Sequence, residues 1–97
     1  MISLLLLTSI IYSQQCNKNN WKDYYNKDSK NMTGCNLREA NLAGVDLTGA
    51  NLRKTNLTEA KLKGADISGV KSGEIKGEPS SLPDGWSLVD GQLIQNE

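Results

Sequence analysis

The stretch CNLREANLAGVDLTGANLRKTNLTEAKLKGADISG, residues 35–69, repeats one five-residue pattern seven times. A small residue opens each unit, an Asn, Asp or Lys follows, and the third position is always Leu or Ile. The large aliphatic residues therefore recur at every fifth position: Leu37, Leu42, Leu47, Leu52, Leu57, Leu62 and Ile67. Any structure of this stretch must account for a five-residue repeat.

Neither regular secondary structure fits this spacing. Residues five apart in an α-helix differ in direction by about 140°, so the leucines would scatter around the helix. In a straight strand an odd spacing would place successive leucines on opposite faces. The chain must therefore turn once in each unit, so that the small and large residues of every unit can face a shared interior.

These units resemble the pentapeptide repeat family, whose pattern is A-[DN]-L-x-x. KNMTG, residues 30–34, forms an eighth, imperfect unit. The resemblance implies an all-β fold, a short right-handed quadrilateral parallel β-helix of about two coils over residues 30–71, with four units and twenty residues per coil. The expected core is the repeated large position, comprising Met32, Leu37, Leu42, Leu47, Leu52, Leu57, Leu62 and Ile67.

Residues 72–97 are predicted to form a turn-rich C-terminal cap. The segments WSLV and QLI flank Asp90-Gly91, a pair typical of two-residue hairpin turns. The sequence pattern LP-x-G-W-x-L-V-x-G-x-L-I resembles a segment found in some members of the family. We expect a β-hairpin-like cap that closes the coil with its large apolar residues, Trp86, Leu88, Val89, Leu93 and Ile94.

Residues 14–29 are predicted to cap the other end. This segment is polar apart from its aromatic residues and suits a short helix around Trp21–Tyr25, with Asn19 or Asn20 as its N-cap. Its expected role is to cover the first coil.

Residues 1–13 are predicted to be a signal peptide. The apolar run 2–12 is shorter than the roughly 20 residues that a membrane-spanning helix requires, and Ser13 offers a cleavage point. The alternatives are a short uncleaved anchor, a misassigned start of the chain or a buried hydrophobic segment, and lipidation at Cys16, which the preceding Gln15 disfavours. The expected location is secreted or periplasmic, without a stable membrane span.

Two interpretations of the cysteines remain open. In an oxidising compartment Cys16 and Cys35 could form a disulfide, closing a loop worth about 3 kcal/mol in the chain-entropy model. Alternatively, Cys35 is only a filler, because it occupies a repeat position otherwise held by Ala, Val or Thr.

Composition argues against catalysis. The chain has no His, which removes the commonest general base and zinc ligand, and no cluster of catalytic, cofactor-binding or metal-binding residues stands out. The acidic residues of the repeat, such as Asp46 with Asp66 and Glu39 with Glu59, are interpreted as solvated surface. We therefore expect no enzyme activity, no cofactor and no metal.

The family resemblance offers an alternative function, inhibition of DNA gyrase by mimicry of DNA. That function requires a long, strongly acidic rod, whereas residues 30–69 hold six basic and four acidic residues. These are Lys30, Arg38, Arg53, Lys54, Lys61 and Lys63 against Glu39, Asp46, Glu59 and Asp66. The sequence favours an exported structural or protein-binding module that does not bind nucleic acid.

The partner is expected to be an unidentified protein or a second copy of the chain. Because packing explains the repeated residues, any specific activity is expected among Arg38, Arg53, Lys54, Lys63 and the two caps.

Overall fold

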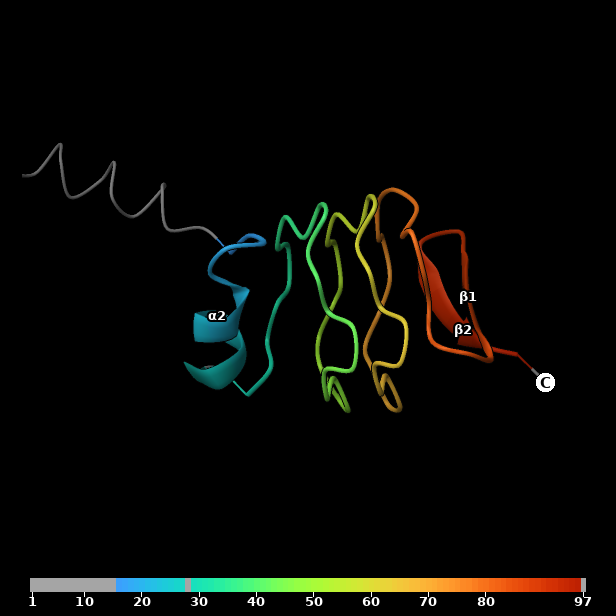
Figure 1. Cartoon of the computed structure of the whole chain (residues 1–97), viewed down its shortest axis with the longest axis horizontal. Helices are drawn as coiled ribbons and strands as arrows, with labels where there is room; N and C mark the ends of the chain where they lie inside the picture. Colours follow the sequence, from blue (N-terminus) through green and yellow to red (C-terminus); the bar gives the residue numbers. More distant parts are fainter. Residues whose placement is uncertain (1–15, 28, 97) are drawn as a thin grey trace, which may run out of the picture.

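The computed structural model describes residues 16–27 and 29–96, and the predicted signal peptide lies outside this part. The chain winds through stacked coils between one short helix, α2 (Trp21–Lys27), and a two-stranded sheet of β1 (Trp86–Val89) and β2 (Gln92–Gln95) (Figure 1). Within the described ranges, no helix is both long enough and apolar enough to span a membrane.

Parallel bridges join residues of successive coils that are twenty positions apart. A bridge links Asn36 to Asn56, where the Leu37 N–H donates to the Asn56 carbonyl over 2.9 Å and the Asn56 N–H donates to the Cys35 carbonyl over 3.0 Å. The full set with this spacing is Asn31–Asn51, Asn36–Asn56, Asn41–Lys61, Asp46–Asp66, Asn51–Lys71, Asn56–Lys76 and Lys61–Ser81. The described chain is thus a β-helix.

The parallel bridges extend further along the chain than the pattern of repeated leucines. The last clear unit ends at Gly69, yet bridges continue to Lys76 and Ser81. Backbone groups carry these bonds, so a coil can continue after the repeated leucines have stopped.

A hydrogen-bonded turn follows each large residue. The Ala40 N–H donates to the Leu37 carbonyl over 2.9 Å, and the intervening Glu39 has a φ of 62°. Positive φ at the third residue is typical of a type II turn and favours glycine, as at Gly64 with a φ of 78°. The turns thus explain why glycine recurs in the last position of the unit.

The polar second residue of most units bonds within its own turn. The Asn36 Oδ1 accepts from the Arg38 N–H over 3.3 Å, an arrangement typical of Asn and Asp. Lysine cannot accept such a bond. At Lys61 the Ser81 hydroxyl of the next coil accepts instead from the Lys63 N–H, over 3.2 Å.

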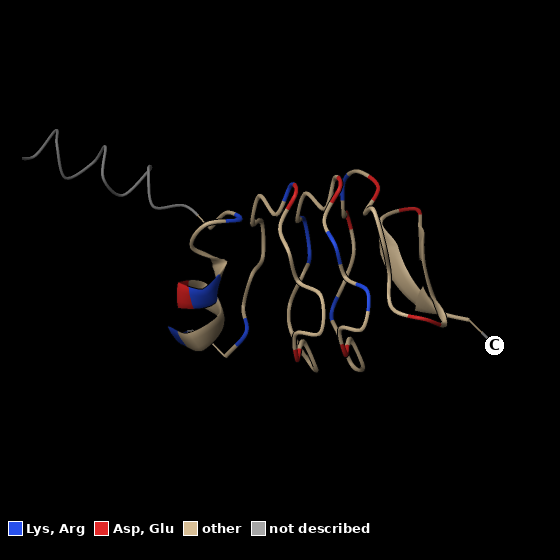
Figure 2. Ribbon diagram, in the orientation of Figure 1, with Lys and Arg blue, Asp and Glu red and all other residues tan. Residues whose placement is uncertain are grey.

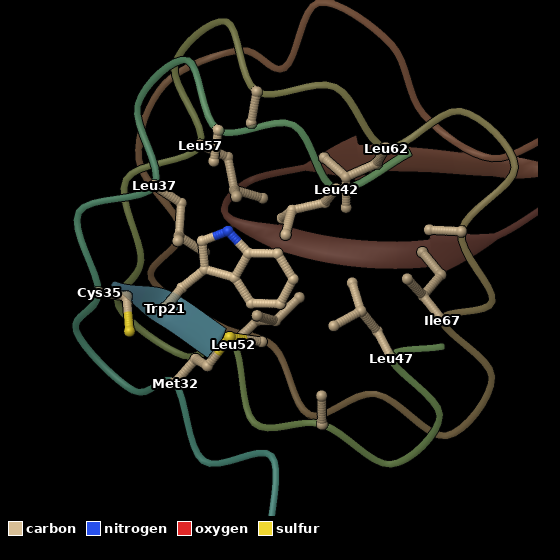
Figure 3. Close-up of a cluster of buried hydrophobic side chains, with 14 of the residues drawn as sticks. Trp21, Met32, Cys35, Leu37, Leu42, Leu47, Leu52, Leu57, Leu62 and Ile67 are labelled. Atoms are coloured by element: carbon tan, nitrogen blue, oxygen red, sulfur yellow. The ribbon is translucent and has the colours of Figure 1, made fainter. Parts of the chain in front are cut away.

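The large residues of the repeat fill the interior and point inward from their turns (Figure 3). Each is exposed by no more than 1%: Met32, Leu37, Leu42, Leu47, Leu52, Leu57, Leu62 and Ile67. Thr55 is also buried, and its hydroxyl donates to the Leu52 carbonyl over 2.9 Å. Among the described residues, no buried side-chain polar atom lacks a hydrogen-bond partner.

The N-terminal cap places α2 against the first coil. The prediction of a short helix at Trp21 is confirmed, and the helix extends to Lys27. Trp21 is buried across the middle of the leucine cluster (Figure 3) and meets the Tyr25 ring edge to face, with 5.9 Å between the ring centroids. The Tyr25 hydroxyl donates to the Asp46 carbonyl over 2.5 Å, so the helix also occupies part of the ladder's first edge.

The C-terminal cap contains the predicted hairpin, whose strands pair antiparallel with Leu88 opposite Leu93. Asp90 and Gly91 both have positive φ, 49° and 78°, as a type I′ turn requires. Leu93 is buried, and its N–H donates to the Ser72 hydroxyl over 3.0 Å.

One detail of the predicted cap is wrong. Val89 and Ile94 do not close the coil but are 47% and 43% exposed, because side chains of a strand alternate between its two faces. Ile75, which was not expected in the core, is buried in the same cluster as Leu93. Its N–H donates to the Gly91 carbonyl over 3.1 Å.

Candidate functional site

The described interior of the coil is lined by buried side chains. The large residues of the repeat are each exposed by no more than 1%, and the polar side chains of the repeat mostly bond within their own turns. The outer surface and the two ends of the coil are therefore the parts most accessible to a ligand or partner.

Four acidic residues of the coil, Glu39, Asp46, Glu59 and Glu74, are paired with basic neighbours. The Lys18 Nζ lies 3.4 Å from a Glu39 carboxylate oxygen, and the Arg38 guanidinium lies 3.7 Å from the Glu59 carboxylate. Basic and acidic segments are interspersed over the coil (Figure 2). Within the described residues there is no group of three or more His, Cys, Asp or Glu that could hold a metal ion.

The basic residues singled out by the sequence fall into two groups. Arg38 and Lys54 lie within ion-pair distance of Glu59 and Glu74, at 3.7 and 3.9 Å, as exposed pairs that contribute little to stability. In contrast, Arg53 and Lys63 form no ion pair with any described residue. The second group is therefore free to meet a partner.

Lys30 and Asp46 join the N-terminal cap to the first coil. The Lys30 Nζ lies 3.4 Å from an Asp46 carboxylate oxygen and 3.1 Å from the Thr48 carbonyl. The same ammonium group lies 5.7 Å from the centre of the Tyr25 ring, within cation–π range. This contact fixes the start of the coil beneath α2.

The pKa of Asp46 is held below its ordinary value. The main cause is the Thr48 hydroxyl, which donates to the carboxylate; the Thr48 N–H adds a second bond over 3.0 Å, and Lys30 contributes less. All three favour the ionised form. This carboxylate is therefore part of a turn and a cap contact rather than an acid–base group.

The two cysteines meet at the junction of the cap and the first coil. Cys16 and Cys35 are joined by a disulfide with 4.7 Å between their Cα atoms. Cys35 is 1% exposed, and the Cys16 carbonyl accepts from the Asn36 N–H over 2.9 Å. The Cys35 side chain thus occupies its small repeat position and carries the bond at the same time.

Two shallow depressions lie at opposite ends of the coil. One, of about 290 Å³, is polar and lined by Asn17, Lys18, Asn19, Asn36, Arg38 and Glu39. The other, of about 370 Å³, lies where the chain leaves the coil and is lined by Lys63, Gly64, Ala65, Asp66, Ile67, Pro83, Asp84 and Trp86. Sequence reasoning anticipated neither, because each forms between segments that are distant along the chain.

A ladder of parallel bridges at one fixed spacing around a single repeated core defines the chain as a β-helical repeat protein. Comparison with protein-family models identifies the repeat: residues 31–71 match Pentapeptide repeats in eight copies. Residues 31–71 therefore form a run of pentapeptide repeats. Neither the comparison with curated proteins nor the comparison with solved structures yields a match.

Proposed function

We propose that this β-helical repeat protein is an exported, non-enzymatic module that binds another protein through its outer surface. The observation that carries the proposal is that core packing and turn bonds occupy the repeated side chains, while charged groups such as Arg53 and Lys63 remain unpaired on the surface. Such a rigid scaffold with a few free charges suits recognition rather than chemistry.

Export is supported by the apolar run 2–12 and by the disulfide, which persists in oxidising compartments. Expression in the native host followed by fractionation tests it. We expect the protein in the periplasmic or secreted fraction, with a mature N-terminus near Gln14. Recovery in the cytoplasm with residues 1–13 retained would contradict export.

Protein binding is tested by affinity capture from that exported fraction. Wild type is compared with Arg53→Glu/Lys63→Glu, which reverses the two unpaired charges, and with Arg38→Gln/Lys54→Gln, which alters basic residues already in ion pairs. We expect a partner that wild type and the second variant retain and the charge-reversed variant loses. Equal capture by all three would rule out these free charges as the recognition surface.

We also infer that the coil is right-handed and quadrilateral. Four bridge positions per twenty residues support a four-sided cross-section, with one turn after each large residue. A crystal structure tests this inference through the hand and the number of corners of each coil. A left-handed or three-sided coil would contradict it.

A further inference from the structure

The charges of the chain are divided unevenly along its length. Residues 77–97 contain four acidic residues and no Lys or Arg. All 11 basic residues lie within residues 1–76, together with the remaining seven acidic residues. The turns beside β1 and β2 carry acidic residues, and neither the turns nor the strands carry a basic one (Figure 2). The neutral chain therefore consists of an acidic C-terminal cap and a remainder with an excess of four positive charges.

The outer face of the hairpin is apolar at its centre. Val89 and Ile94 are 47% and 43% exposed, and they are the large hydrophobic residues that the described part of the chain leaves exposed. Val89 pairs with Gln92 and Ile94 pairs with Ser87, so the two apolar side chains are diagonal neighbours on one face of the sheet. Asp90 follows Val89 directly, so this apolar centre has a carboxylate at its border.

At the opposite end of the stacked coils, α2 exposes lysines (Figure 1). Trp21 is buried against the coil, whereas Lys22 and Lys27 are exposed and form no ion pair with any described residue. Asp23 is the exposed carboxylate of this helix. Residues 16–30 as a whole contain four lysines and two aspartates, so this end of the molecule has a positive excess.

Charge and shape make the two ends complementary to each other. A lysine side chain can cover apolar surface with its aliphatic stem while its ammonium group stays in contact with water or a carboxylate. The stems of two lysines therefore suit the apolar centre of the hairpin, and their ammonium groups suit the carboxylates at its border. Contact between two hairpins would instead bring like charges together, which is unfavourable.

We propose that copies of the chain associate head to tail, with the outer face of the hairpin of one copy against α2 of the next. Lys22 and Lys27 lie over Val89 and Ile94 of the neighbouring copy. Because the two surfaces differ, the contact repeats and produces an open row of copies. Each end is small, so the association is weak, with a Kd on the order of 100 µM. The inference goes beyond the proposed function, because it uses the caps rather than Arg53 and Lys63.

The test measures the mean solution mass of the full chain, with its disulfide intact, by sedimentation at increasing protein concentration. We expect the mass to rise with concentration in about 20 mM NaCl and to return toward the monomer in about 0.5 M NaCl, because salt screens exposed charges. Val89→Thr/Ile94→Thr removes the apolar centre but keeps β-branched residues, and is expected to weaken association about tenfold.

Charge reversal at each end gives the sharper test. One variant is Lys22→Glu/Lys27→Glu, and the other is Asp84→Lys/Gln92→Lys, which avoids Asp90 because its positive φ disfavours lysine. We expect each variant alone to stay monomeric where wild type associates. An equimolar mixture should associate again, because each reversed end meets an end of opposite charge, and a misfolded variant could not restore the contact. Arg53→Glu/Lys63→Glu reverses two charges on the flank and should associate like wild type.

Three outcomes would overturn the proposal. The first is a monomeric wild type at every concentration, and the second is a mixture of the two reversed variants that fails to associate. The third is association that is equal in all variants and insensitive to salt, which would assign it to the apolar run 2–12. A wild type that stops at the dimer would likewise show a contact between identical faces and refute the head-to-tail arrangement.

Discussion

At the residue scale, most side chains of the repeat have two tasks. Asn36 faces solvent and yet fixes its turn by accepting from the Arg38 N–H, while Thr55 fills a core position and donates to the Leu52 carbonyl. Glu39 adopts positive φ, a conformation that costs a non-glycine residue about 1–2 kcal/mol. The packing and the ladder hydrogen bonds of the coil must offset that cost in free energy.

The lowered pKa of Asp46 predicts an acid-sensitive contact. A carboxylate whose pKa falls on folding stabilises the protein above its ordinary pKa of about 4, and this contribution is lost as the pH falls through the lowered value. Asp46→Asn is therefore expected to be less stable than wild type at neutral pH, with the difference shrinking as the pH falls below the ordinary pKa of a carboxyl group. Thermal unfolding at a series of pH values measures the difference.

The matched control for this prediction is Thr48→Val, which removes the hydroxyl that contributes most to the shift. It is expected to raise the pKa of Asp46 toward its ordinary value and to reduce the effect of Asp46→Asn. A stability difference that is the same at every pH would contradict the interpretation.

Alanine substitutions at two glycines distinguish the cost of backbone strain from the cost of a steric clash. Gly34 and Gly77 have φ values of 74° and 82°, but an added Cβ would have open space at Gly34 and would lie 2.9 Å from the Thr58 nitrogen at Gly77. Gly34→Ala is expected to cost about 1–2 kcal/mol, the strain alone. Gly77→Ala should cost clearly more in urea titrations, and equal losses would show that the chain around Gly77 shifts easily to relieve the clash.

At the element scale, the two caps close the coil by different means. Helix α2 covers the first coil with Trp21 and satisfies the Asp46 carbonyl of the ladder through Tyr25, while Lys30, which follows the helix, satisfies the Thr48 carbonyl. The hairpin covers the last coil with Leu93, whose N–H donates to the Ser72 hydroxyl. Both are short elements that gain their stability from the coil they cover.

The disulfide predicts that the N-terminal cap depends on oxidation. Breaking the Cys16–Cys35 bond with Cys16→Ser/Cys35→Ala is expected to cost about 3 kcal/mol, since it frees a loop of about 20 residues in the unfolded chain. Alanine suits position 35 because other units carry it there. A reductant should lower the melting temperature of wild type to that of the variant and leave the variant unchanged; an insensitive wild type would refute the prediction.

At the scale of the whole molecule, stability rests on one continuous core that runs from Trp21 through the coils to Leu93. Each coil contacts only the coils next to it. Each end of the stack therefore presents a core face that a cap must cover. A small repeat of this kind should unfold as a single unit.

Substitutions at one buried and one exposed aliphatic residue test whether stability depends on this core. Leu57 is fully buried, whereas Val89 is 47% exposed on the outer face of β1. Leu57→Ala is expected to lower the free energy of unfolding by about 2–5 kcal/mol, and Val89→Ala by less than about 0.5 kcal/mol. Denaturant titration measures both, and similar losses would show that the hairpin's outer face is covered in solution.

Several features followed from the sequence by itself. The five-residue spacing of Leu37 to Ile67 excluded helix and straight strand, because only a turn in every unit brings all the leucines to one interior. Asp90-Gly91 predicted the hairpin through the positive φ values that its turn requires. The helix at Trp21 followed from its polar surroundings and capping residues. Local geometry decides each of these features, so neighbouring residues suffice to predict them.

Other features were decided only by the tertiary structure. The ladder continues to Ser81 without a leucine pattern, Ser81 replaces the missing acceptor at Lys61, and Ile75 rather than Val89 completes the core. The depression beside Trp86 forms where the chain turns at Pro83. These features depend on contacts between residues some twenty positions apart, where the packing of one coil on the next, rather than local preference, determines which groups meet.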